Sequence, residues 1–204
     1  MKPFDLFPSS LQKILIKLEE RDKKEREAGL GRFQRLRQIP RETGEFLFQF
    51  LTVFSLQFPE FVGLEIGTSG GYSTLWQGMA LAINDLGRLI SLDHDPKKYQ
   101  LASENISSSE VGKYVTLIQG DAKKYLTKSR KRFNYVFMDC KKEDYVYFFN
   151  YFITRLTSGS VLIADNVISH ADDMPDFIEQ IKNHTRVSSI ILPIGSGLAF
   201  IRWL

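Results

Sequence analysis

The sequence predicts an α/β fold in which a seven-stranded, mostly parallel sheet carries helices on both faces. From residue 59 onward, short apolar runs alternate with helical stretches, a pattern typical of parallel sheets. The chain ends differently, because two apolar runs flank the turn Pro193–Gly197 and predict a hairpin with one antiparallel strand. A length of 204 residues, of which 43% are hydrophobic and 25% charged, suits one globular domain.

The first 45 residues are expected to form a helix followed by a loop. Four apolar residues recur at helical spacing: Leu11, Ile14, Leu15 and Leu18. The helix expected from Leu11 to Glu27 is wholly polar after Leu18, so we expect it to lie on the surface or to reach a partner subunit. Residues 28–45 are predicted to be a basic loop with helical fragments, and Phe46–Phe58 a mostly buried helix.

Strands and helices are then expected in alternation. The predicted strands are Val62–Ile66, Arg88–Asp93, Val115–Gln119, Tyr135–Met138, Val161–Asp165, Ser189–Leu192 and Leu198–Trp203. The predicted helices are Ser73–Asn84, Pro96–Ser107, Ala122–Lys128, Tyr145–Leu156 and Pro175–Lys182. No interdomain linker is evident, so residues 1–204 are predicted to be one domain, with an N-terminal part (1–45) and a core (46–204).

The sequence favours a cytoplasmic protein without a membrane partner. Cys140 is the lone cysteine and cannot form an internal disulfide, which suits a reducing compartment. The N-terminal sequence lacks the apolar core of a signal peptide. The apolar stretch Phe46–Phe58 is too short and too interrupted to span a bilayer.

The net charge of +3 is unevenly distributed. Residues 1–42 contain 11 Lys or Arg and 7 Asp or Glu. A second basic cluster contains no acid and comprises Lys123, Lys124, Lys128, Arg130, Lys131 and Arg132. Both segments fit a solvated surface, and both also fit contact with a polyanion such as RNA.

Acidic residues stand at or next to the ends of five successive predicted strands: Glu65, Asp93, Asp121, Asp139 and Asp165. In open parallel sheets, ligands bind outside the carboxyl ends of the strands. The series therefore predicts a polar pocket at one edge of the sheet that accepts a metal ion or another cation.

A glycine-rich turn follows the first predicted strand. Gly67, Gly70 and Gly71 let the backbone approach a ligand closely, and the helix that begins near Ser73 offers free N–H groups. Asp93, 22 residues after Gly71, ends the next strand and can accept hydrogen bonds from ribose hydroxyls.

This spacing fits both a nicotinamide dinucleotide and another adenosine cofactor. The glycines do not follow the pattern G-x-G-x-x-G, and Glu65 at the strand end would repel a pyrophosphate. A positively charged ligand suits Glu65, so S-adenosylmethionine fits better than NAD.

Oxygen-bearing side chains at two neighbouring strand ends indicate a divalent cation. Asp139, Asp165 and Asn166 offer ligands of the kind that Mg²⁺ prefers, whereas no Cys/His cluster suits structural zinc. Lys142 is the candidate base, because the neighbouring cation Lys141 and a bound metal would disfavour its ammonium form.

Together these residues resemble the cation-dependent, S-adenosylmethionine-dependent O-methyltransferases, the family of catechol and caffeoyl-coenzyme A O-methyltransferases and their bacterial relatives. The likeness covers about residues 36 to 203 and implies a Rossmann-like class I methyltransferase fold. It implies that Ile39–Leu47 covers the cofactor and the substrate. Relatives often have Asp in place of Lys141 and Gly-Asp-Gly in place of Gly195-Ser196-Gly197, so the acceptor stays open.

The resemblance also implies roles for single residues. The cofactor-binding residues that it implies are Ile39, Glu65, Gly67, Ser69, Ser73, Asp93, Asp121, Ala122 and Asp139. The ligands that it implies for a cation, taken as Mg²⁺, are Asp139, Asp165 and Asn166. Lys142 matches the catalytic lysine, and Tyr145 matches the tyrosine of the pattern D-x-x-K-x-x-Y.

The expected activity is methyl transfer to a hydroxyl of a small catechol-type phenol, with Lys142 accepting the proton. An alternative within the family is methylation of a hydroxyuridine in tRNA, which the basic segments favour slightly. An NAD-binding oxidoreductase and a non-catalytic binding protein are alternatives from other classes. A homodimer is expected, supported by the aromatic helix Phe46–Phe58.

Overall fold

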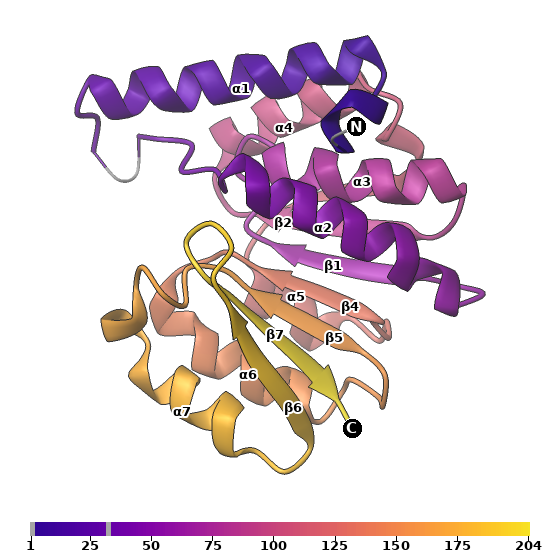
Figure 1. The fold of residues 1–204 in the computed structure, drawn as a ribbon, viewed down its shortest axis with the longest axis vertical. Coiled ribbons are helices and arrows are strands. Elements are labelled where there is room, and N and C mark those ends of the chain that lie inside the picture. The colour runs from indigo at the N-terminus through magenta and orange to yellow at the C-terminus, as the bar shows by residue number, and fades with distance from the viewer. Residues whose placement is uncertain (1–2, 32–33) are drawn as a thin grey trace.

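One seven-stranded sheet forms the centre of the computed structural model, which describes residues 3–31 and 34–204 (Figure 1). Across the sheet the strands lie in the order β3-β2-β1-β4-β5-β7-β6. Their bounds are β1 Val62–Ile66, β2 Arg88–Asp93, β3 Val115–Gln119, β4 Tyr135–Met138, β5 Val161–Ala164, β6 Val187–Leu192 and β7 Leu198–Trp203. Strands β1 to β5 pair in parallel, and β7 is antiparallel to both neighbours. The predicted fold class is confirmed.

Seven α-helices of the described chain accompany the sheet: α1 Ser9–Glu27, α2 Arg41–Phe54, α3 Tyr72–Asn84, α4 Pro96–Ser107, α5 Ala122–Lys128, α6 Tyr145–Ile153 and α7 Pro175–Asn183. Short 3₁₀ helices are η1 Pro3–Leu6, η2 Ser55–Gln57, η3 Gly112–Tyr114, η4 Lys142–Asp144 and η5 Ala171–Asp173. No described helix has the length and apolar character needed to cross a membrane.

Each face of the sheet has its own hydrophobic cluster, because successive side chains of a strand point to opposite faces. In β4, Tyr135 and Phe137 belong to the cluster under α1 to α4. Val136 and Met138 belong to the cluster under α5 to α7. The near-continuous apolar strands are therefore buried on both sides, as expected for a parallel sheet.

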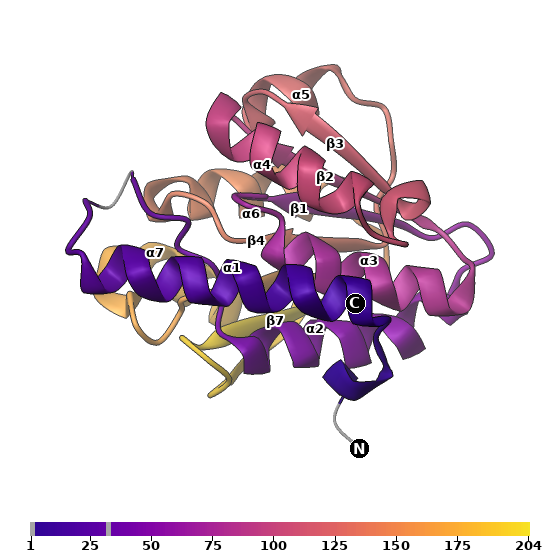
Figure 2. The same ribbon diagram turned by 90° about the horizontal axis from the view of Figure 1, so that it is seen from above.

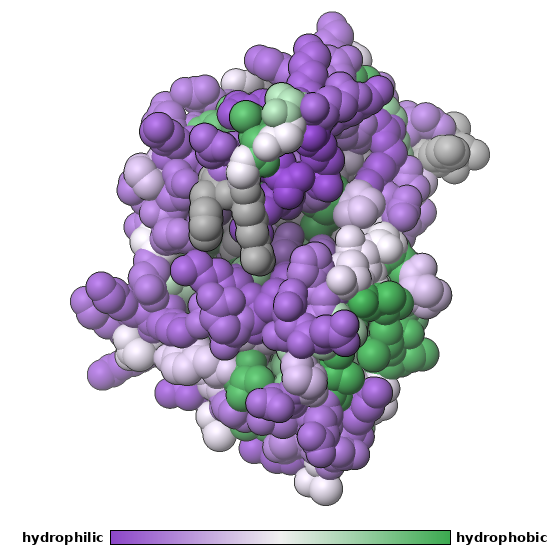
Figure 3. All heavy atoms as spheres, turned by 90° about the vertical axis from the view of Figure 1, so that its left-hand side faces the viewer, coloured by the Kyte–Doolittle hydropathy of each residue, from purple (hydrophilic) through white to green (hydrophobic). Residues whose placement is uncertain are grey.

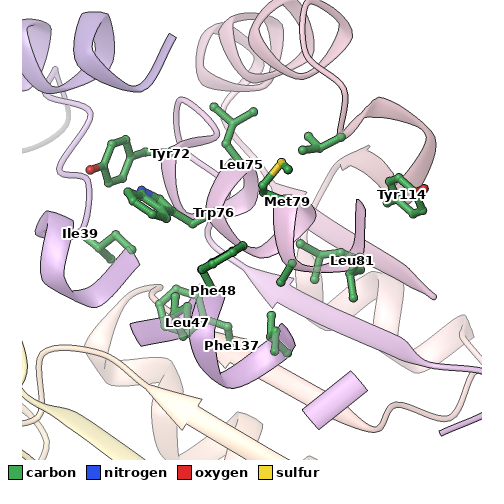
Figure 4. Close-up of a cluster of buried hydrophobic side chains, with 14 of the residues drawn as sticks. Ile39, Leu47, Phe48, Tyr72, Leu75, Trp76, Met79, Leu81, Tyr114 and Phe137 are labelled. Carbon is green, nitrogen blue, oxygen red and sulfur yellow. The ribbon is translucent and has the colours of Figure 1, made fainter. Parts of the chain in front are cut away.

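Helix α2 begins at Arg41, five residues before the predicted start at Phe46. Pro40 precedes it in an extended conformation, and Glu42 in the first turn interacts favourably with the helix dipole. Gly44 lets α2 approach α3 closely, since a Cβ atom there would lie 2.5 Å from Nε1 of Trp76. Figure 4 shows Trp76 beside Phe48 in this contact.

Helix α1 lies alongside α3 (Figure 2). The expectation that its polar half lies on the surface is wrong for Asp22 and Glu25, which are each only 8% exposed. Both carboxylates are paired within the helix: Asp22 Oδ2 lies 2.6 Å from Arg26 Nε, and Glu25 Oε1 lies 2.8 Å from Arg21 Nε. Ion pairing offsets part of the cost of burying these two carboxylates, although Asp22 Oδ1 has no hydrogen-bond partner within the described residues.

Candidate active site

A cavity of about 1180 Å³ opens at the carboxyl ends of the parallel strands. Figure 3 views the molecule from the side at which β1 ends, where the surface is mostly hydrophilic and hollowed near its centre. The strand ends contribute one wall, and residues of α1 together with residues 35–41 contribute the opposite wall. The predicted position of the pocket is confirmed. The predicted cover Ile39–Leu47 is only partly right: Ile39, Pro40 and Arg41 line the cavity, the residues after Arg41 continue helix α2, and residues 35–41 form the covering segment.

The turn after β1 is built against the end of β4. Gly67 has φ +111°, and a Cβ atom there would lie 2.0 Å from the carbonyl oxygen of Asp139, so only glycine fits. The Ser69 N–H donates to Asp93 Oδ2 at 2.7 Å, which ties the turn to the end of β2. All four residues, Gly67, Ser69, Asp93 and Asp139, line the cavity.

Asp93 and Asp121 lie at the part of the cavity expected to hold adenosine. The second oxygen of Asp93 accepts from the Asp95 N–H at 2.9 Å. Because a carboxylate oxygen accepts more than one hydrogen bond, Asp93 retains capacity for ribose hydroxyls. Asp121 caps α5 by accepting from the Lys124 N–H at 3.0 Å, and Ala122 lines the cavity beside it.

Two hydrogen bonds anchor the covering segment at Leu36. The Leu36 N–H donates to Glu25 Oε2 of α1 at 2.7 Å, and its carbonyl accepts from Ser69 Oγ at 2.6 Å. Further along, Ile39 is buried against the cavity. Arg41 donates to both carboxylate oxygens of Glu19, at 3.0 and 2.5 Å. Helix α1, the covering segment and the glycine turn thus form one connected wall.

The structure does not place Glu65 among the residues that line the cavity. Its side chain is fully buried and accepts four hydrogen bonds, from Ser73, Thr74, Gln77 and Ser91, at 2.5 to 2.7 Å. Burial raises the pKa of the Glu65 carboxyl, and the four donors oppose that shift. Ser73 reaches a small recess beside Gly67, so Glu65 lies behind a lining residue.

Asp139 and Asp165 follow neighbouring strands, since Met138 of β4 pairs with Ala164 of β5. Asp165 is 1% exposed, and its Oδ1 has no hydrogen-bond partner within the described residues. Burial, and then the Asp139 carboxylate, raise the pKa of Asp165 to about 7. A buried, unpartnered carboxylate oxygen beside a second carboxylate is an arrangement that a divalent cation fits.

Asn166 completes the predicted set of oxygen ligands and adopts φ +66°. Asparagine tolerates this left-handed conformation better than most side chains. The turn Gly195–Gly197 holds the segment that follows: the Gly197 carbonyl accepts from Val167, and the Ser196 carbonyl accepts from Ile168 and Ser169.

Lys142 stands in the middle of this group. Its Nζ donates to Asn166 Oδ1 at 2.5 Å, to Tyr145 Oη at 2.8 Å and to Asp139 Oδ1 at 3.3 Å. The side chain is nearly buried, at 6% exposure. Lys142 and Asn166, which are 24 positions apart in the sequence, are therefore in direct contact. Such a contact is required if the lysine and the proposed cation ligands form one site.

Several residues that line the cavity were not predicted from the sequence to belong to the site. Among them are Glu19, Lys23, Arg26, Arg37, Tyr72 and Ser196. Those on α1 belong to a polar run that resembles a solvated surface. The only sequence feature that indicated burial is the i,i+4 spacing of opposite charges, which form ion pairs in the structure.

Backbone conformation also marks the residues of the site. Four described non-glycine residues have positive φ, and three of them, Arg37, Ser69 and Asn166, line the cavity. Such strain clusters at functional sites.

The strand order and the cavity at the strand ends define a class I methyltransferase fold. Solved structures agree: the SAH-bound methyltransferase of Podospora anserina superposes with a TM-score of 0.78 at 19% identity, over 97% of this chain and 88% of that one. Residues 13–204 match the O-methyltransferase family model, and the chain belongs to that family. This membership argues against the NAD-binding oxidoreductase that the spacing had left open.

The chain is also similar in sequence to curated proteins that are named methyltransferases. A catechol O-methyltransferase of Niastella koreensis is 36% identical over 109 residues, which are 52% of this chain and 48% of the relative. That alignment spans about half the length of the relative. Tapetum-specific methyltransferase 1 of Arabidopsis thaliana is 26% identical over 200 residues, covering 88% of this chain and 84% of that protein.

Replacing Glu65 by leucine tests whether this carboxylate supports the glycine turn from below. We expect Glu65→Leu to lower the free energy of unfolding by about 3 kcal/mol, because buried donors lose their acceptor. Urea denaturation measures the loss, and the exposed Glu60→Leu is the matched control, with a change within about 0.5 kcal/mol. A Glu65→Leu protein as stable as the wild type would contradict the supporting role.

Proposed function

We propose that this chain is an S-adenosylmethionine-dependent O-methyltransferase that uses a divalent cation to methylate a hydroxyl of a small catechol-type phenol. The observation that carries the proposal is the convergence of Asp139, Asp165, Asn166 and Lys142 beside the glycine turn, at one end of a large cavity. Membership of the O-methyltransferase family and the relatives named catechol O-methyltransferase support it.

The cofactor side of the cavity suits an adenosyl sulfonium. Asp93 would accept from the ribose hydroxyls, and Asp121 with Ala122 would flank the adenine. The methionine end would lie in the region of Ile39, Gly67, Ser69, Ser73 and Asp139. The carboxylate of Asp139 favours the positive charges of the ligand there. Glu65 would contribute through Ser73, which it holds at 2.6 Å.

The cation would be held by Asp139, Asp165 and Asn166, whose oxygens suit Mg²⁺. When bound, such an ion acts as a Lewis acid and lowers the pKa of a substrate hydroxyl. Lys142 would accept the proton of that hydroxyl, and the walls of the cavity would orient the acceptor toward the cofactor. Catechols suit the site because they offer two adjacent hydroxyls to one cation.

Metal removal and an Asp165→Ala variant test this proposal. We expect EDTA to lower the rate of catechol methylation by about 100-fold or more, and Mg²⁺ to restore it. Asp165→Ala should lose as much activity and keep its affinity for S-adenosylhomocysteine within about threefold, because Asp93 and the glycine turn remain. Methylation rates and calorimetric titration measure the two effects.

The matched control is Asp172→Ala, which removes an exposed carboxylate of η5 outside the cavity lining. Its methylation rate should equal that of the wild type. A full rate in excess EDTA, with the metal content of the protein verified as nil, would refute the role of the cation.

Transfer to a hydroxyuridine of tRNA is a second candidate, favoured by the basic cluster around α5. Its exposed members form no ion pair within the described chain: Lys124, Lys128, Arg130, Lys131 and Arg132. Lys123, by contrast, is paired with Asp144, and both line the cavity. None of the five exposed cations lines the cavity: Lys124 directly follows the cavity residue Lys123, and Lys128 to Arg132 lie between the end of α5 and the start of β4. All five are available to phosphates.

If tRNA is the acceptor, its affinity should fall by about 10³-fold between 50 and 200 mM salt. The double variant Lys128→Glu, Arg130→Glu should weaken tRNA binding further and leave the methylation of a small catechol unchanged. Filter binding at several salt concentrations measures the slope. Binding that is weak at low salt and insensitive to the double variant would eliminate this candidate.

We also propose a homodimer formed through an apolar surface of α2, β6 and β7. Phe50 of α2 packs on Phe200 of β7, with ring centroids 5.2 Å apart. Ile190 pairs with Phe200 across the strands, shares its face and is 57% exposed. Val53 of α2 is 67% exposed. Figure 1 shows β6 and β7 without a covering helix on this side.

Sedimentation should therefore give twice the mass of one chain, and Ile190→Glu should shift the equilibrium to monomers, because a charge would be buried unpaired. The exposed Arg186→Glu at the start of the same hairpin is the control and should leave the dimer intact. A wild-type protein that sediments as a monomer at 50 to 100 µM, on the order of a weak dimer's dissociation constant, would rule out this interface.

A further inference from the structure

The amino group of Lys142 occupies the middle of the proposed cation ligands. A protonated amine has three N–H donors and no acceptor. Nζ has three partners, and all of them accept: Asp139 Oδ1, Tyr145 Oη and Asn166 Oδ1. The geometry therefore offers Nζ one acceptor for each of the three hydrogens of an ammonium group.

Two of these partners are oxygens that the proposed cation would need. Nζ bridges the two side chains, at 3.3 Å from Asp139 Oδ1 and 2.5 Å from Asn166 Oδ1. An ammonium at this point and a divalent cation on the same oxygens would repel each other strongly in a poorly solvated site. The two cations therefore compete for one position.

Tyr145 gives the amino group a third anchor that the divalent cation does not need. The Tyr145 hydroxyl lies within hydrogen-bond distance of the carbonyls of Asp165, at 3.0 Å, and of Met138, at 3.2 Å. Its hydrogen is directed to these carbonyls, so its lone pairs are left for Nζ at 2.8 Å. Lys142 can thus leave Asp139 and Asn166 and keep a hydrogen-bond partner.

We propose that the Lys142 ammonium is the internal counter-ion of the cation site, bridging Asp139 and Asn166 until a divalent cation displaces it toward Tyr145. The inference rests on the ligand set given under the proposed function. It assigns Lys142 a role before the metal binds that is separate from the role of proton acceptor: the ammonium offsets the charge of the Asp139 carboxylate, which lies 3.3 Å from Nζ. The lysine then sets how tightly the cation binds.

Titration of Mn²⁺ into metal-free protein tests the competition without any measurement of catalysis. Lys142→Met keeps the length of the side chain and removes the competing charge. We expect it to bind Mn²⁺ about tenfold more tightly than the wild type, the size of one lost charged hydrogen bond. Lys141→Met is the matched control, since it removes the same charge from an exposed neighbour, and it should change the affinity by less than about threefold.

Equal or weaker binding of Mn²⁺ to Lys142→Met would overturn the inference and leave the proposed function intact. No binding of Mn²⁺ to either protein would overturn the inference together with the ligand set. Crystals of the wild type with and without Mn²⁺ provide a test that needs no variant. Nζ should lie within about 3.5 Å of Asn166 Oδ1 only in the metal-free crystals, and an unmoved Nζ would also overturn the inference.

Discussion

The backbone contact between the ends of β1 and β4 determines how the rest of the site can be built. Gly67 lies so close to the carbonyl of Asp139 that no side chain fits between them. The turn that approaches a cofactor and the first of the proposed cation ligands are thereby held against each other. In the sheet, β1 lies between β2 and β4, so Asp93 and Asp139 flank the glycine turn from either side. Because the ends of β1, β2 and β4 lie next to one another, the proposed cofactor site and the proposed cation site are neighbours.

Two buried carboxylates show how environment separates a structural from a functional acid. Glu65 is surrounded by four neutral donors, so its charge is satisfied and it needs nothing from a ligand. Asp165 retains an unpartnered oxygen and lies beside a second carboxylate. The first arrangement stabilises the fold around α3. The second leaves a buried oxygen without a partner, and a divalent cation would supply the positive charge that this oxygen lacks.

The sheet was predictable because its strands are short apolar runs of the right length, and six of the seven β-strand predictions match to within one residue at each end; β6 begins two residues earlier than predicted. The sequence also placed Asp139, Asp165, Asn166 and Lys142 at adjacent strand ends, where the structure has them. It could not reveal that Glu65 points under α3, because its donors come from residues 73 to 91 and only folding brings them together. Nor could apolar periodicity reveal the burial of Asp22 and Glu25, which are charged residues with an ion-pair partner four residues away on the same helix.

The cover over the cavity is coupled to the acid expected to bind ribose. Ser69 donates its N–H to Asp93 and its hydroxyl to the carbonyl of Leu36, while the Leu36 N–H donates to Glu25 of α1. A chain of hydrogen bonds thus runs from the floor of the cavity to the helix above it. Residues 35–41 could move away from the cavity only by breaking the contact of the Ser69 hydroxyl with Leu36. The position of this segment and the orientation of Asp93 are therefore linked through one residue, Ser69.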